Sequence, residues 1–370
     1  MIKKKRIYLI LEVQHRELDA RIAFALKASQ LGYSVVFCKK AYLLSKSKYL
    51  IKGIVILKSI GIKNKKFIKE LKRNGHIVCS FDEEGLLFHD KEKYCKRRLP
   101  KECFDEIKYF FAWGENDAKA INSFYPNDKN KVKIAGNSRF ELLKEPLSRI
   151  YLKGAEIIRK KFGDFILVNT KFGYSNYVSK KKNFSIVDGL TKAWNLKENE
   201  QSFYKYILDS QLKRRKDLID LINLFENKYP NVKFIIRPHQ SEDSEFWNNL
   251  KNKNITIIRD GKPSLSWMIA AKKIISFNCT TAIEAKFFNI DHLNYIPLNK
   301  NDFVLPNNIN KNFDNIIDLE MHLISNDSKK SIFNINELKN NIENVDNDYV
   351  RNIIEFLKDD FKELKIQKKD

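Results

Sequence analysis

Short apolar runs alternate with amphipathic segments along the first third of the chain. The apolar runs are short enough to be buried strands, and they cover residues 7–13, 34–38, 53–57, 76–81, 109–112 and 132–134. Amphipathic segments at 20–31, 65–74 and 116–124 predict helices, and Gly32 and Gly75 follow the first two at the position where a helix commonly ends. Strands separated by helices at this spacing predict βαβ units and a parallel sheet.

The same pattern restarts after Gly136. It predicts strands at 165–169, 233–236, 255–258 and 273–277, and helices at 151–162, 213–228, 264–271 and 280–288. Residues 178–200 lack a clear period and predict a loop. Residues 349–364 predict a charged terminal helix, which Asp346-Asn347-Asp348 would cap.

We therefore expect an α/β protein with two Rossmann-like domains, residues 1–145 and 146–340, that face each other across a cleft. A C-terminal helix at 341–370 would follow them. Ligands of such sheets bind beyond the carboxyl ends of the strands. The candidate site residues are accordingly those that directly follow predicted strands.

Composition fits a folded protein with a basic surface. The chain has 370 residues, of which 43% are hydrophobic and 12% aromatic, so it can bury a substantial core. Its net charge of +23 is typical of a protein that meets a nucleic acid, an anionic membrane surface or a polyanionic substrate. No basic-aromatic signature of RNA binding accompanies the charge, so we expect no specific nucleic acid. The lysines recur in short clusters, including 63–66, that would attract anionic lipid.

The sequence favours a cytoplasmic location. Its five cysteines form no C-x-x-C pair, and their odd number argues against a disulfide framework. The basic start and the apolar stretch after it imitate a signal peptide, but Glu12 interrupts the stretch and no small-residue cleavage site follows. No run approaches the roughly 18 apolar residues of a membrane span. We expect a cytoplasmic protein, at most peripheral on the inner face of the plasma membrane.

An acidic cluster follows the predicted strand at 76–81. It consists of Asp82, Glu83 and Glu84, and Gly85 would let the chain turn there. Like-charge repulsion and partial burial should raise the pKa of at least one of these carboxylates. A carboxylate so placed could take a proton from a hydroxyl nucleophile. The alternative is an acidic helix N-terminus, stabilised by the helix dipole.

Basic and polar residues follow two strands of the second half. Arg237-Pro238-His239 comes after the strand at 233–236, where a planar guanidinium and an imidazole could bind phosphate oxygens. Asn169 and Thr170 follow the first strand of this half and could add polar contacts.

A small hydroxyl cluster follows the strand at 273–277. Asn278, Thr280 and Thr281 lead into the predicted helix, where they could present donors to an anion or simply cap the helix. Glu284 lies at the capping-box spacing from Thr281, and it could instead hold a ribose hydroxyl. The sequence contains no G-x-G-x-x-G, Walker, H-E-x-x-H or G-x-S-x-G motif, so dehydrogenase, P-loop, zincin and hydrolase functions lose their main support.

The chain resembles the bacterial sialyltransferases and Kdo transferases in the order of three clusters across two α/β domains. These are the acidic cluster with its Gly, then Arg-Pro-His, then the hydroxyl pair. Both groups of enzymes are GT-B glycosyltransferases with a D/E-D/E-G motif, an HP motif and an S/T pair. Over residues 1 to about 300 the chain is also similar to the bacterial surface carbohydrate biosynthesis proteins, in Arg16-Glu17-Leu18-Asp19-Ala20, Phe110-Phe111-Ala112-Trp113-Gly114 and Gly136-Asn137-Ser138-Arg139.

The resemblance implies transfer of a Kdo- or sialic-acid-like sugar from a CMP-linked donor to a glycan hydroxyl. The catalytic base would be Asp82, Glu83 or Glu84, with one of the first two favoured. His239, Thr280 and Thr281 would bind the donor phosphate, and no metal would be needed because Arg237 and His239 neutralise the leaving group. The acceptor would be a lipid-linked glycan or polysaccharide, next to the anionic inner membrane.

Three alternatives stay open. Gln240 stands where the HP motif has Pro, and Arg237-Pro238-His239 is also similar to the teichoic-acid glycerophosphotransferases, which use CDP-alditols. A nucleotide-sugar 2-epimerase would share the two-domain architecture. A nucleic-acid-binding module rests on the charge alone. The sugar, the acceptor and the stereochemical course are not predicted.

Overall fold

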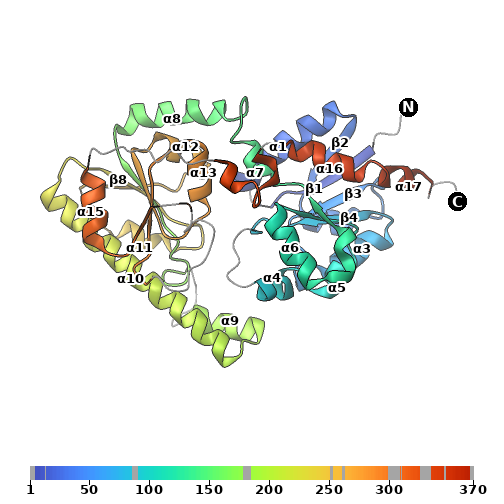
Figure 1. Cartoon of the computed structure of the whole chain (residues 1–370), viewed down its shortest axis with the longest axis horizontal. Helices are drawn as coiled ribbons and strands as arrows, with labels where there is room; N and C mark the ends of the chain where they lie inside the picture. The colour runs from blue at the N-terminus through green and yellow to red at the C-terminus, as the bar shows by residue number, and fades with distance from the viewer. Residues whose placement is uncertain are drawn as a thin grey trace. The chain divides into compact units, whose positions relative to one another are not determined.

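The structure is a computed structural model that describes residues 5–12, 14–85, 91–177, 185–250, 253–260, 263–298, 309, 311–325, 335–345 and 347–366. The chain divides into two compact units (Figure 1). The first comprises Met1–Ser148 and Asn334–Asp370, and the second Arg149–Phe333. The segment from 341 onward, which the sequence separates as a third part, thus belongs to the first unit.

The first unit is built on a parallel sheet of six strands in the order β2-β1-β3-β4-β5-β6. The strands are β1 (Lys5–Ile10), β2 (Tyr33–Cys38), β3 (Ile54–Leu57), β4 (Ile77–Phe81), β5 (Phe110–Ala112) and β6 (Val132–Ile134). The predicted parallel sheet is confirmed, and each strand lies within a few residues of its predicted span.

Helices cover both faces of this sheet because alternate strand residues point to opposite sides. They are α1 (Gln14–Gln30), α2 (Lys40–Lys46), η1 (Ile62–Asn64), α3 (Lys65–Arg73), α4 (Lys91–Arg98), α5 (Lys101–Phe104), α6 (Glu115–Phe124), η2 (Pro126–Lys131) and α7 (Ser138–Glu141). Tyr8 and Val55 face a core shared with α2 to α6. Ile7 and Ile54 face the opposite core, shared with α1 and the C-terminal helices.

The C-terminal segment completes the first unit, and its helices lie beside the sheet, in red in Figure 1. It forms η3 (Ile335–Leu338), η4 (Glu343–Val345), α16 (Tyr349–Leu357) and α17 (Asp360–Ile366). Asp348 caps α16 by accepting a hydrogen bond from Arg351 N at 3.0 Å, as predicted, whereas Asp346 lies outside the described residues. Gly114 allows close docking of this segment, because an added Cβ would lie 2.5 Å from the carbonyl carbon of Asn341.

The second unit repeats the architecture with a parallel sheet in the order β12-β11-β10-β7-β8-β9. Its strands are β7 (Ile166–Asn169), β8 (Phe234–Arg237), β9 (Ile255–Ile257), β10 (Lys273–Ser276), β11 (His292–Tyr295) and β12 (Lys311–Phe313). Its helices are α8 (Arg149–Phe162), α9 (Ile186–Trp194), α10 (Glu198–Lys228), α11 (Ser244–Asn248), α12 (Ser264–Ala270), α13 (Thr281–Phe287) and α15 (Ile316–Ile324).

The prediction of a loop at 178–200 is wrong for residues 186–194 and from residue 198 onward. Residues 186–194 form α9, and α10 begins at Glu198, well before the predicted start at 213. Ser185 caps α9 by accepting from Asp188 N, and Val187 packs with Leu196 and Tyr204 in a small separate core. Local capping and this satellite core stabilise helices whose apolar periodicity is weak. Residues 178–184 lie outside the described part.

No helix among the described residues is both long and apolar enough to cross a membrane.

Candidate functional site

The acidic cluster forms a tight turn at the carboxyl end of β4. The backbone N–H of Gly85 donates to Asp82 O at 3.3 Å, and the N–H of Glu84 donates to Asp82 Oδ1 at 3.2 Å. A Cβ on Gly85 would lie 3.0 Å from the indole of Trp113. The turn is therefore held against β5 and leaves little room for a side chain at position 85.

Asp82 is buried and paired with an arginine. Its side chain is 1% exposed, and Arg98 donates to both carboxylate oxygens, with Nε 2.6 Å from Oδ2. Trp113 Nε1 donates to Asp82 O at 2.6 Å. A carboxylate with both oxygens bound to a guanidinium is poorly placed to take up a proton.

The other two carboxylates differ in exposure. Glu83 Oε1 accepts from Arg21 Nη2 at 2.9 Å, and the guanidinium of Arg21 lies over the Phe81 ring. Glu84 Oε2 lies 3.7 Å from Arg98 Nη1, and the Glu84 side chain is 48% exposed. Arginines from α1 and α4 therefore relieve the charge crowding expected from the sequence, and Glu84 is the most accessible of the three.

Asp117 is a buried carboxylate behind the acidic turn that the sequence analysis missed. It lies in the first turn of α6, where Oδ2 accepts from Trp113 N at 3.1 Å, and Oδ1 has no hydrogen-bond partner among the described residues. The pKa of Asp117 is raised to about 7, mainly by burial; the hydrogen bond from Trp113 opposes this rise and the charge of Asp82 adds to it. No local pattern marks such a residue, because its environment comes from three separate segments.

In the second unit, the site residues predicted after the strands β7, β8 and β10 lie together at the carboxyl ends of these strands. β7 lies between β10 and β8, and Asn169 pairs in register with both Ser276 and Arg237. The residues that follow these strands therefore leave neighbouring strand ends. Lys171 Nζ donates to Asn278 O at 2.8 Å, which joins the loops after β7 and β10.

Glu242 organises the loops after β7 and β8. It is 0% exposed, and Oε1 accepts from Thr170 Oγ1 at 2.7 Å and from Phe172 N at 2.8 Å. Its Oε2 accepts from Trp247 Nε1 at 2.9 Å. Burial raises the pKa of Glu242, and these hydrogen bonds oppose that rise. The sequence offered no signal for it beyond one acid in a polar loop.

The Arg-Pro-His cluster presents a partly buried cation and an exposed imidazole. Arg237 is paired with Asp260 at 3.2 Å and lies 5.7 Å from the centre of the Trp267 ring. Burial lowers the pKa of Arg237, and Asp260 opposes that effect. The His239 side chain is exposed, and its Nδ1 lies 2.8 Å from Ser241 Oγ. The backbone N–H of His239 donates to Thr170 Oγ1 at 3.2 Å.

The loop after β10 does not cap α13 with its threonines. Thr280 occupies the N-cap position in helical geometry without a side-chain hydrogen bond, so the simple capping interpretation is wrong. Thr281 Oγ1 is buried with no hydrogen-bond partner among the described residues, and a capping box with Glu284 is therefore not formed. Asn278 adopts a left-handed φ of 62°, and its N–H donates to Asn294 Oδ1 at 2.7 Å.

Two further buried polar atoms lie at the same edge. Asn169 Nδ2 and Asn278 Oδ1 have no hydrogen-bond partner among the described residues, although both residues are more than nine-tenths buried. Buried polar atoms normally find a partner. The carboxyl ends of β7 and β10 thus hold one buried donor and one buried acceptor without a partner among the described residues.

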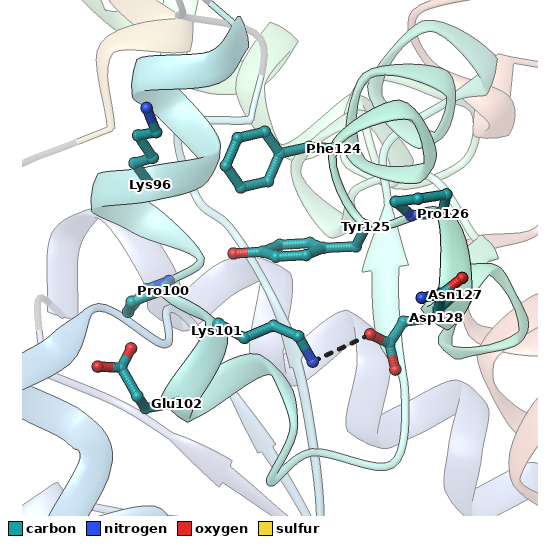
Figure 2. A pocket seen from close by; sticks show the side chains of 9 residues that line it. All are labelled: Lys96, Pro100, Lys101, Glu102, Phe124, Tyr125, Pro126, Asn127 and Asp128. Carbon is teal, nitrogen blue, oxygen red and sulfur yellow. Dashed lines mark hydrogen bonds and ion pairs between the residues drawn. The ribbon is translucent and has the colours of Figure 1, made fainter.

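A separate hollow of about 510 Å³ lies in the first unit, between the end of α4, α5 and the junction of α6 with η2. Figure 2 shows the rings of Phe124 and Tyr125 beside Lys101, whose Nζ lies 3.2 Å from Asp128. None of the predicted site residues lines it. Within the described ranges, no group of three or more His, Cys, Asp or Glu residues is arranged to hold a metal ion.

Comparison with known proteins gives structural neighbours only. No model of a protein family and no curated protein matches the sequence. The wall teichoic acid polymerase TagF superposes with a TM-score of 0.59 at 11% identity, covering 97% of this chain and 90% of that one.

Two further structures are similar in fold. The Staphylococcus aureus MnaA–UDP structure has a TM-score of 0.55 at 12% identity, covering 97% of each chain. The UDP-GlcNAc 2-epimerase of Methanocaldococcus jannaschii has a TM-score of 0.57 at 12% identity, covering 96% of this chain and 99% of that one. The chain thus consists of two Rossmann-like domains, each with a six-stranded parallel sheet, and has the GT-B fold.

Proposed function

We propose that this protein is a transferase of surface-carbohydrate synthesis that takes its transferred group from a cytidine-nucleotide donor, with a CDP-alditol as the first candidate. The observation that carries the proposal is the set of ligand-binding groups at the ends of β10, β7 and β8. Lys171, Arg237 and His239 supply cationic or donor groups, and Asn169 and Asn278 supply buried polar atoms that have no partner among the residues the structure describes.

These groups suit a diphosphate. Guanidinium and ammonium groups make strong, charge-assisted hydrogen bonds to phosphate oxygens. They would also stabilise the negative charge that develops on the leaving nucleotide. A CDP donor is preferred to the CMP-sugar of the sequence prediction for two reasons. Gln240 replaces the Pro of the HP motif, and a structure of the similar TagF was determined after a soak with CDPG.

We assign the proton-accepting role to Glu84. It is the accessible carboxylate of the acidic turn, whereas Asp82 is bound on both oxygens by Arg98 and Glu83 faces Arg21. Glu84 would take the proton of the acceptor hydroxyl as that oxygen attacks the donor. Asp82 and Arg98 then position the turn.

Product analysis tests the proposal. The protein is incubated with CDP-glycerol, a CMP-linked sialic acid or Kdo, or a UDP-N-acetylhexosamine, with and without a hydroxyl-bearing glycan acceptor. We expect acceptor-dependent release of CMP from CDP-glycerol and a new phosphodiester on the acceptor. A new glycosidic bond from the CMP-sugar would restore the donor predicted from the sequence, and no transfer from either cytidine donor would refute the proposal.

A nucleotide-sugar 2-epimerase is the second candidate, favoured by the similarity in fold to the UDP-GlcNAc 2-epimerase of Methanocaldococcus jannaschii. The same incubations separate it from a transferase, because an epimerase converts the UDP-sugar to its C2 isomer without any acceptor. Isomer formation in the acceptor-free sample would decide for this candidate.

A further inference from the structure

The short helix α2 and the turn after it attach to the first unit by only a few side chains. Leu43 is fully buried in the core beneath the sheet, and Ser47 is 1% exposed. The apolar residues around them face outward, and Tyr49 is 78% exposed. The other exposed apolar residues of this segment are Tyr42, Leu44 and Ile51. A small protein surface rarely leaves so many large apolar side chains together in contact with water.

The same segment is strongly basic. The sequence has no Asp or Glu between Asp19 and Glu70. Lys39, Lys46 and Lys48 are exposed on the segment and have no ion pair among the described residues. The apolar side chains are therefore interleaved with cations that form no ion pair with any carboxylate in the described part of the chain.

The basic cluster at 63–66 lies beside this segment. Lys40 Nζ donates to Asn64 Oδ1, and it also lies 5.1 Å from the centre of the Phe67 ring. Next to that contact, Ile62 is 52% exposed and Lys63 and Lys66 are exposed. We call the exposed residues of 39–51, together with Ile62, Lys63 and Lys66, the α2 surface.

We propose that the α2 surface binds the anionic headgroup layer of a lipid bilayer. Lysines near such a surface are attracted to anionic lipid, and tyrosines are enriched at the membrane–water interface. Leucine and isoleucine side chains can enter the boundary with the acyl chains, as on an amphipathic helix that lies in the interface. Exposed aliphatic side chains offer little to a phosphate backbone, which favours a bilayer over a nucleic acid. This proposal does not depend on the proposed function.

Vesicle co-sedimentation tests it with the full chain. We expect binding to phosphatidylcholine vesicles that contain phosphatidylglycerol, little binding to pure phosphatidylcholine, and release at high salt. The double variant Lys46→Gln with Lys48→Gln should lower the partition coefficient roughly 30-fold, from about fivefold for each lysine. A second double variant, Tyr49→Ser with Ile51→Ser, should also lower it and tests the apolar contribution.

The exposed face of α8 in the second unit provides matched controls (Figure 1). Lys160→Gln with Lys161→Gln removes the same charge, and Ile150→Ser with Ile157→Ser removes apolar side chains that are 69% and 62% exposed. Both should leave vesicle binding unchanged, and all variants should keep the far-UV circular dichroism and melting temperature of the wild type.

The proposal is overturned if the wild type does not bind anionic vesicles, or if the α8 variants lose binding as strongly as the α2 variants. Equal binding to neutral vesicles would also overturn it. So would a titration in which the α2 variants lose binding to an RNA oligonucleotide while the wild type ignores vesicles.

Discussion

The carboxylate of Asp117 should make stability depend on pH. An unfolded Asp titrates near pH 3.9, whereas burial raises the pKa of Asp117 in the folded protein to about 7. Between these values the folded protein holds a proton that the unfolded chain has lost, so rising pH favours unfolding. The free energy of unfolding falls by at most about 1.4 kcal/mol per pH unit, and this fall is complete above pH 7.

The variant Asp117→Asn removes that titration. Its free energy of unfolding relative to the wild type should therefore rise between about pH 4 and pH 7 and then level off. Urea unfolding across this range measures the difference. Asp209→Asn, which replaces an exposed carboxylate, is the control for the loss of one negative charge. If the free-energy difference between Asp117→Asn and the wild type did not change with pH, the raised pKa of Asp117 would be contradicted.

The two ends of the acidic turn should respond differently to neutralisation. Glu84→Gln should lower kcat by about 10²- to 10⁴-fold, without changing the melting temperature or the affinity for CDP, because Glu84 is exposed and serves as the base. Asp82→Asn should instead cost about 1–3 kcal/mol of unfolding free energy, because it leaves Arg98 without its main partner. Full activity of Glu84→Gln, or an unaltered stability of Asp82→Asn, would count against these roles.

For single residues, the sequence predicted where the site residues lie in the sheet better than it predicted which side chains they contact. Asp82 and Thr170 directly follow strands and Arg237 ends one, and a position at a strand end can be predicted from local pattern. Their partners could not be predicted. Arg98, Glu242 and Asp260 lie 16, 72 or 23 residues from the groups they contact, and only the folded chain brings them there.

Among the structural elements, the loops after β7 and β8 depend on Glu242. Glu242→Ala should destabilise the protein by about 3 kcal/mol, because several buried donors would lose their acceptor. Glu242→Gln should cost less, since one carbonyl oxygen remains, but its amide would face Trp247 Nε1. Trp247→Phe removes that donor.

A double-mutant cycle between Glu242→Gln and Trp247→Phe measures the coupling. We expect the double variant to be more stable than the sum of the two single effects predicts, by about 1 kcal/mol. Additive effects would mean that the hydrogen bond between Oε2 and the indole contributes nothing to holding these loops.

Strands were easier to predict than helices in this chain. Buried runs such as 54–57 are continuous and apolar, so their pattern alone identifies them. Helix α9 and the first half of α10 carry weak periodicity and depend on a cap at Ser185 and on the satellite core around Val187 and Tyr204. β11 (His292–Tyr295) and β12 (Lys311–Phe313) were missed because their short polar sequences become strands only by pairing with β10 and with each other.

At the scale of the whole molecule, the alternation of strands and helices predicted two Rossmann-like domains, and the resemblance to sialyltransferases and Kdo transferases implied the GT-B fold. The structure and its neighbours confirm both. The fold alone does not select a substrate, because transferases and epimerases share it. The choice of a cytidine donor therefore depends on the groups at the ends of β7, β8 and β10.

Calorimetric titration of CDP tests that choice most directly. We predict that CDP binds the wild type, and that Lys171→Ala and His239→Ala each weaken binding at least about tenfold, as expected for the loss of a charge-assisted hydrogen bond. Lys160→Ala, on the exposed face of α8, should bind CDP like the wild type. Absence of CDP binding, or an affinity that Lys171→Ala and His239→Ala leave unchanged, would contradict the account.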